Sequence, residues 1–141
     1  ISRATEVGAS EIQIIYNLLD RRPEGKPFDL CRSQDLGVLA RVPLASGFLS
    51  GKYGPKATFP ENDVRSNWDR EKIRHTAQEV QRLQDEELPQ ELEMSQWALA
   101  WALQNPAVTC VIPGCKNVEQ VEKNAGAAEL DMVSDSHPSA C

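Results

Sequence analysis

The sequence GVLARVPLASGFLSGKY, from Gly37 to Tyr53, decides the fold of this chain. Its apolar start predicts a buried strand over Val38–Val42, and after Pro43 the chain opens into a loop of Ser and Gly residues that ends at Lys52. Glycines let backbone amides approach a ligand closely, and exposed amides beside a lysine suit a phosphate. Because α/β folds bind ligands beyond the ends of their strands, the loop predicts a phosphate site. An ordinary connection is the alternative, since Gly and Ser favour any loop.

The composition around this stretch is that of a globular domain with a core of its own. The chain has 141 residues, of which 40% are hydrophobic and 26% charged. Its formal net charge of −6 argues against nucleic acid or an anionic membrane surface as a partner. No apolar run approaches the ~20 residues that a membrane-spanning helix needs. We therefore expect neither nucleic acid nor a membrane as a partner.

The four cysteines, Cys31, Cys110, Cys115 and Cys141, contain no CxxC pair, and the chain has only two histidines. We therefore expect no metal site. Cys110 stands in an apolar run and is expected to be a small core residue. This cysteine pattern is typical of the reducing cytoplasm, which is the predicted location.

Alternating strands and helices flank the decisive stretch. A strand is predicted over Ile12–Leu18, then a charged loop over Asp20–Pro27 and a short helix over Phe28–Leu36. The polar segment Gly54–Asn67 is interpreted as a loop or lid, because loops this long are usually functional or disordered. Asp69 can cap the helix that follows. The apolar positions of that helix recur at helical spacing and predict its buried face: Ile73, Ala77, Val80 and Leu83.

The C-terminal part continues the alternation. Met94–Leu103 is apolar nearly all round and predicts a buried helix, followed by a strand over Val108–Ile112. Asn117 can cap a last helix, with Gln120 at the capping-box position. The expected inner stripe of this helix consists of Val118, Val121, Ala125 and Ala128, and the tail Asp131–Cys141 is polar and loosely specified.

The element order predicts a parallel α/β sheet that is part of a larger barrel. A (β/α)8 barrel needs eight strands and roughly 250 residues, so three βα units are less than half of one. A second loop suited to phosphate, Pro113–Asn117, runs into the N-terminus of the last helix, where unpaired amides favour anions. Because the loops after the last two barrel strands are the usual phosphate site, the two loops are expected to be neighbours.

Four stretches together resemble the C-terminal part of the aldo-keto reductases, which are NADPH-dependent oxidoreductases on a (β/α)8 barrel. They are EIQIIYNLL (Glu11–Leu19), PLASGFLSGKY (Pro43–Tyr53), SQWALAWALQNPAV (Ser95–Val108) and VIPGCKNVEQVEKN (Val111–Asn124). The resemblance implies that residues 1–141 form a partial NADP-dependent oxidoreductase domain. It would hold barrel strands six to eight with their helices, and the N-terminal half would be absent.

The resemblance also assigns cofactor roles. Gln13 would hydrogen-bond the nicotinamide carboxamide, although a polar residue at a strand end is the plain alternative. Arg41 stands where many members carry an aromatic residue that stacks on the nicotinamide ring; a guanidinium can also stack on a flat ring, but it brings a positive charge. The residues that would hold the pyrophosphate are Leu44, Ser46, Gly47 and Leu49, with Lys52 as an added charge.

The second loop would take the adenosine end of the cofactor. Gly114, Cys115 and Lys116 match the turn that holds the adenosine 2′-phosphate, and the charge of Lys116 favours NADPH over NADH. Gln120 and Asn124 match residues beside the adenosine, with a helix cap and a surface polar residue as the alternatives.

The residues that would perform the reduction have no counterpart here. The family reaction uses a tyrosine acid, whose pKa a lysine lowers, with an aspartate and a histidine, and these belong to the first four barrel strands. Tyr16 and Tyr53 lie in other motifs, and His75 is expected on a helix surface. We therefore expect no catalytic residue in this chain, no reductase activity of its own, and weak NADPH binding or none by the chain alone.

Two other interpretations stay open. Barrels of this family also serve as non-enzymatic, NADPH-binding β subunits of ion channels. A free-standing half-barrel could instead dimerise to cover its open sheet edges. The chain begins at Ile1, so we expect it to be part of a longer protein that reduces a small carbonyl substrate, with a processed N-terminus as the alternative.

Overall fold

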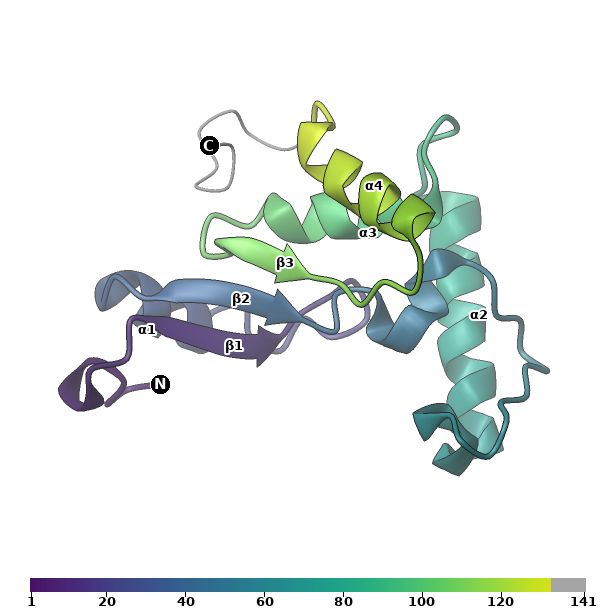
Figure 1. Ribbon diagram of the computed structural model, residues 1–141, viewed down its shortest axis with the longest axis horizontal. Helices are drawn as coiled ribbons and strands as arrows, with labels where there is room; N and C mark the ends of the chain where they lie inside the picture. The colour runs from purple at the N-terminus through teal and green to yellow at the C-terminus, as the bar shows by residue number, and fades with distance from the viewer. Residues whose placement is uncertain (133–141) are drawn as a thin grey trace.

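The computed structural model describes residues 1–132 and contains a parallel three-stranded sheet (Figure 1). The strands β1 (Glu11–Ile15), β2 (Gly37–Arg41) and β3 (Cys110–Ile112) lie side by side in that order. The predicted parallel α/β arrangement is therefore confirmed. β1 ends earlier than predicted because the Asn17 side chain accepts hydrogen bonds from the backbone N–H groups of Leu19 and Asp20, which turns the chain.

Four α-helices accompany the strands in the described part of the chain: α1 (Lys26–Ser33), α2 (Arg70–Glu86), α3 (Met94–Leu103) and α4 (Val118–Ala125). Asp69 caps α2 by accepting from the Glu71 N–H, as predicted. α1 begins before its predicted start because Pro27 fits the first turn of a helix. α3 has the bounds that its apolar composition predicts.

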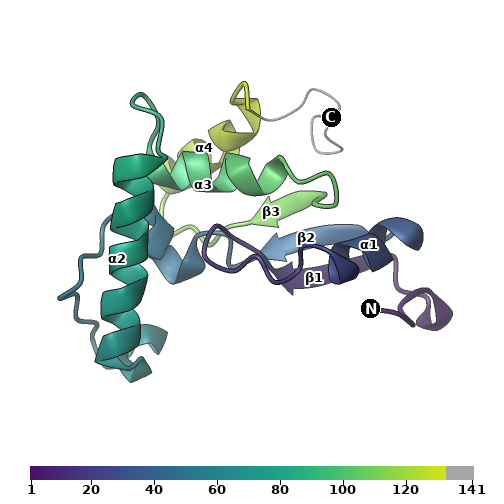
Figure 2. The ribbon, with the colours of Figure 1, turned by 180° about the vertical axis from the view of Figure 1, so that it is seen from behind.

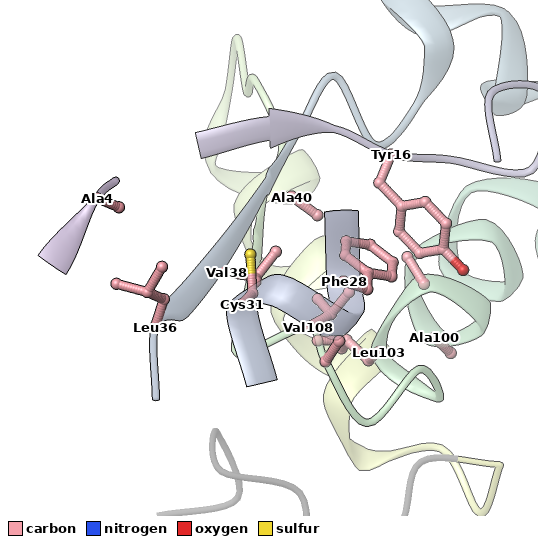
Figure 3. Packing of buried hydrophobic residues seen from close by; sticks show 12 residues of the cluster. Ala4, Tyr16, Phe28, Cys31, Leu36, Val38, Ala40, Ala100, Leu103 and Val108 are labelled. Atoms are coloured by element: carbon pink, nitrogen blue, oxygen red, sulfur yellow. The ribbon is translucent and has the colours of Figure 1, made fainter. Parts of the chain in front are cut away.

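Helices α1 and α3 cover one face of the sheet, whereas no described element covers the other (Figures 1 and 2). Val38 and Ala40 of β2 point to the helices and are fully buried. They pack with Phe28 and Cys31 of α1 and with Leu103 of α3 (Figure 3). This layer is the first of two cores and holds the strands in place.

The second core lies beyond the carboxyl ends of the strands, where α2 crosses the strand direction (Figure 1). Phe48 and Leu49 of the 3₁₀ segment η2 (Ala45–Ser50) enter it and are fully buried. The predicted inner face of α2 meets them there: Ile73, Ala77, Val80 and Leu83. Packing in this core therefore holds the loop after β2 against α2.

Two burial predictions are wrong, and both for the same reason. The expected inner stripe of the last helix, made of Val118, Val121, Ala125 and Ala128, is exposed, and Ala128 lies beyond α4 in the 3₁₀ turn Gly126–Glu129. Cys110 is only half-buried, because it pairs in register with Leu39 on the sheet face that no helix covers. Both positions would need a further layer of protein to be buried.

No helix within residues 1–132 is both long enough and apolar enough to cross a bilayer. Most of the predicted polar tail, from residue 133 onward, lies outside the described residues.

Candidate functional site

A cleft of about 1300 Å³ opens at the carboxyl ends of the three strands. Its walls come from η2, from residues 62–65, from the turn after β3 and from α4. The two predicted phosphate loops face this same cleft, as expected for neighbouring loops of a parallel α/β fold.

All but one of the residues predicted to hold the cofactor line the cleft. Those that do are Gln13, Arg41, Leu44, Ser46, Gly47, Lys52, Gly114, Cys115, Lys116, Gln120 and Asn124. The exception is Leu49, whose side chain is fully buried in the second core and whose N–H donates to the Leu44 carbonyl at 3.1 Å. The Leu49 side chain therefore packs in the second core and does not line the cleft in this structure.

The loop after β2 has an unusual backbone. Val42, Ala45 and Ser46 have positive φ angles of 53°, 48° and 56°, and Gly47 follows with 90°. Such angles are rare for residues other than glycine, above all for a β-branched valine. The N–H groups of Leu44 and Ser46 donate to no backbone carbonyl of the described residues, and both residues line the cleft. Within the described residues, these two N–H groups therefore remain available to a ligand in the cleft.

Arg65 ties the segment Gly54–Asn67 to this loop. Its guanidinium pairs with both carboxylate oxygens of Asp63, at 2.8 and 2.6 Å, and donates to the Ser46 carbonyl at 2.9 Å. It lies 4.6 Å from the ring centre of Tyr53 and 4.1 Å from that of Phe59. The Arg65 hydrogen bonds, aided by the charge of Lys116, hold the pKa of Asp63 well below its usual range. The segment expected to be a loop or lid is therefore packed against the loop after β2.

The turn after β3 is shaped by side chains of α4. Asn117 caps this helix by accepting from the Gln120 N–H at 2.9 Å, and Gln120 Oε1 in turn accepts from the Lys116 N–H at 2.7 Å. Asn124 Nδ2 donates to Cys115 Sγ at 3.2 Å. A side chain added at Gly114 would meet nothing within 4 Å, so the turn is open to the cleft.

The charges along the cleft leave a positive excess. Each acidic lining residue is ion-paired: Asp63 with Arg65, and both Glu93 and Glu119 with Lys123. The remaining cationic lining residues, Arg41, Lys52 and Lys116, form no ion pair within residues 1–132. The chain as a whole is acidic, yet this cleft suits an anionic ligand.

Sequence reasoning missed Asn17, Asp63 and Arg65 as parts of the site. Asn17 Nδ2 donates to the Val42 carbonyl at 2.9 Å, and Arg65 reaches Ser46, so both act across long separations in the sequence. One signal was present: a lone arginine in a polar segment between the aromatic residues Phe59 and Trp68. Periodicity does not detect such contacts, because it describes one element at a time.

The fold and the cleft define this chain as an α/β protein whose strand ends carry a cleft suited to an anionic ligand. Residues 1–139 match the model of the aldo/keto reductase family, and the chain belongs to that family. The aldo-keto reductase yakc of Schizosaccharomyces pombe, whose name specifies NADP(+), is 30% identical over 139 residues, or 94% of this chain and 41% of that protein. A probable voltage-gated potassium channel subunit beta of Oryza sativa is 29% identical over 92% of this chain and 41% of its own length.

Solved structures agree with this assignment. An aldo-keto reductase from Bacillus halodurans, in its holo form, matches with a TM-score of 0.66 and 26% identity over 96% of this chain and 42% of its own. The glycerol dehydrogenase of Gluconobacter oxydans matches with a TM-score of 0.69 and 25% identity over 92% of this chain and 40% of its own. The chain spans about two fifths of the length of these relatives.

Proposed function

We propose that residues 1–141 supply the NADP(H) clamp of an aldo-keto reductase and correspond to strands six to eight of its barrel. The observation that carries the proposal is the cleft, in which two anion-suited loops and three unpaired cations meet at the strand ends within the described chain. The family membership and the NADP(+) in the name of a relative support the choice of ligand.

The donor set of the cleft fits a dinucleotide phosphate. The loop after β2 offers the N–H groups of Leu44 and Ser46 together with the charge of Lys52, which suits a pyrophosphate. The turn at Gly114–Lys116 leads into the N-terminus of α4 and offers a further charge for a 2′-phosphate. Gln13 and Arg41, on β1 and β2, also line the cleft and would hold the nicotinamide.

The chemistry of the whole protein would be the reduction of a small carbonyl compound. Bound NADPH supplies the hydride for such a reaction. The stretches of this chain that resemble the family do not include its tyrosine acid with the lysine, aspartate and histidine, so we infer that the chain alone does not turn over a carbonyl substrate. The likeness to a probable potassium channel subunit beta supports a second candidate function, that of a non-enzymatic NADPH-binding subunit.

A nuclear magnetic resonance titration with millimolar NADPH tests the clamp, since it detects weak binding. Of the two outcomes that the sequence allows, weak binding or none, the proposal commits to weak binding, because the cleft is formed in the chain alone. We expect shifts in the amides of Gln13, Ser46, Gly47, Gly114 and Lys116. NADH should bind more weakly than NADPH, because it lacks the 2′-phosphate. The variant Lys116→Met should remove most of that preference, whereas the matched variant Lys26→Met, on α1 at the far side of the sheet, should keep it.

Two results would contradict the proposal. One is an absence of shifts at these amides in millimolar NADPH. The other is an unchanged NADPH preference in Lys116→Met. A separate assay, which follows the loss of NADPH absorbance with a panel of aldehydes, should show no turnover by the chain alone.

A further inference from the structure

Among residues 1–132, the buried polar or charged side chains are those of Asn17 and Arg65, which expose 2% and 8% of their surfaces. Both donate to carbonyls of the loop after β2. Asn17 Nδ2 reaches the Val42 oxygen at 2.9 Å, and Arg65 Nη1 reaches the Ser46 oxygen, also at 2.9 Å. Burying a polar side chain raises the free energy of the fold unless the side chain is hydrogen-bonded. That both buried polar side chains bind carbonyls of the same loop suggests that they serve this loop.

The carbonyls that they hold belong to the strained part of the loop. Val42 and Ser46 are left-handed residues, and Ala45 between them is a third. Backbone conformations of this kind persist only where the surroundings over-determine them. Asn17 fixes the peptide that follows Val42 at one end, and Arg65 fixes the peptide that follows Ser46 at the other.

The two side chains are themselves held firmly. Asn17 Oδ1 accepts from the N–H groups of Leu19 and Asp20, both at 2.9 Å, so the amide cannot turn over without losing them. The Arg65 guanidinium is gripped by both oxygens of Asp63 and lies against aromatic rings. A side chain added at Gly47 would come within 3.3 Å of Arg65 Nη1, which shows how closely the loop rests on it.

The two held peptides supply no free donor themselves, because Pro43 has no N–H; they fix the two ends of the segment that carries the N–H groups of Leu44 and Ser46. The Gly47 N–H donates to the Leu44 carbonyl at 2.8 Å, whereas the Leu44 and Ser46 N–H groups have no backbone acceptor within residues 1–132. Donors that are fixed before the ligand arrives bind an anion better, because no ordering cost remains at binding.

We infer that Asn17 and Arg65 are positioning residues that preorganise the loop Val42–Gly47 for the pyrophosphate of the cofactor. This inference rests on the proposed function. Arginine is required rather than any cation, since only its planar fork can pair with Asp63, reach Ser46 and lie on aromatic faces together.

Two substitutions isolate the role. Asn17→Asp keeps the oxygen that accepts from Leu19 and Asp20 but removes the donor to Val42. Arg65→Lys keeps the positive charge but loses the planar guanidinium, which binds Asp63 and the Ser46 carbonyl at the same time. Each has a matched control elsewhere: Asn105→Asp removes a donor to the Tyr16 hydroxyl and keeps an acceptor for the Ala107 N–H, and Arg21→Lys breaks a forked pair with Glu24 beside Trp101.

Amide hydrogen exchange resolved to residues 42–47 gives a readout that needs no ligand. We expect faster exchange there in Asn17→Asp and Arg65→Lys, and unchanged exchange there in both controls. We also expect NADPH affinity to fall about five- to tenfold in each variant, the effect of one lost hydrogen bond. Affinity for adenosine 2′-monophosphate should stay unchanged, because that ligand uses the turn at Gly114–Lys116; a general loss of structure would weaken both ligands.

The outcomes separate this inference from the proposed function. If the unaltered chain binds no NADPH, the proposed function fails, and the exchange data still decide whether the two side chains hold the loop. Unchanged exchange at residues 42–47 would overturn the positioning role, as would equal acceleration in the controls. Faster exchange with unchanged NADPH affinity would also overturn it, since the loop would then not serve the ligand. Failure of both variants to fold would show a structural role instead.

Discussion

Arg65 keeps its charge in a place where little water reaches it, and Asp63 makes this possible. The carboxylate lies against the guanidinium through two short hydrogen bonds, and the side chain of Asp63 is itself only 18% exposed. Removing one partner of a buried ion pair leaves an uncompensated charge, which destabilises far more than the loss of an exposed pair. The stability of the loop should therefore depend on the ionisation of Asp63.

The first prediction concerns this pH dependence. Because Arg65 lowers the pKa of Asp63 in the folded state, the pair stabilises the fold above the unfolded pKa, about 3.9, and this contribution is lost as the pH falls toward the folded pKa. The urea midpoint of Asp63→Asn should lie below that of the unaltered chain near pH 7. The gap between the two midpoints should close as the pH falls below about 4.

The control for this experiment is Asp29→Asn, which breaks an exposed pair with Arg32 on α1. Its midpoint should stay close to that of the unaltered chain at every pH. Equal midpoints for Asp63→Asn and the unaltered chain near pH 7 would show that the pair around Arg65 carries no stability.

At the scale of elements, the sequence predicts best those whose partners are near in sequence or whose faces are fully covered. α3 is apolar on all sides, so its burial does not depend on which side faces the sheet. Its bounds therefore follow from its composition alone. α4 has an equally clear stripe, yet Val118 is 71% exposed. Its pattern describes a helix that is covered on that side, whereas residues 1–132 include no element to cover it.

The same limit applies to the site. Small residues at strand ends indicated both loops that line the cleft, because loop composition is a local property. The buried side chains that hold the first loop were not predicted, since Asn17 acts from the turn after β1 and Arg65 from a segment without periodicity. Leu49 belonged to the same motif as its neighbours, but the left-handed turn at Ser46 and Gly47 directs it into the core.

The second prediction compares one substitution on two helices. Val80 of α2 is 1% exposed and packs in the second core, whereas Val121 of α4 is 52% exposed. Val80→Ala should lower the free energy of unfolding by about 2 kcal/mol, because it removes buried methyl groups and leaves a cavity. Val121→Ala should change it by less than about 0.5 kcal/mol. Chemical denaturation monitored by circular dichroism measures both, and a similar loss in Val121→Ala would mean that α4 is covered in solution.

At the scale of the whole molecule, the sheet of the described residues has two open edges and one uncovered face. β1 and β3 are its edge strands within residues 1–132, and one face of the sheet carries no helix layer. Edge strands with unpaired N–H and C=O groups are templates for pairing with another chain. Ile112 stands on the edge strand β3 and is 39% exposed. The open edges and the uncovered face would be buried by a further layer of protein. The N-terminal half of a barrel or a second copy of the chain would provide such a layer.

The third prediction is that the chain associates with itself when it is purified alone. Sedimentation velocity over a concentration series should show masses above that of the monomer, which increase with concentration. Ile112→Lys should shift the distribution toward the monomer, because a lysine on an edge strand opposes pairing and its charge opposes burial of the open face. The matched variant Val7→Lys, at a residue 77% exposed in the N-terminal 3₁₀ turn, should leave association unchanged. A folded monomer at every concentration would contradict the prediction, and it would also count against the view that this sheet needs a missing half, since the exposed edges would then be stable in water on their own.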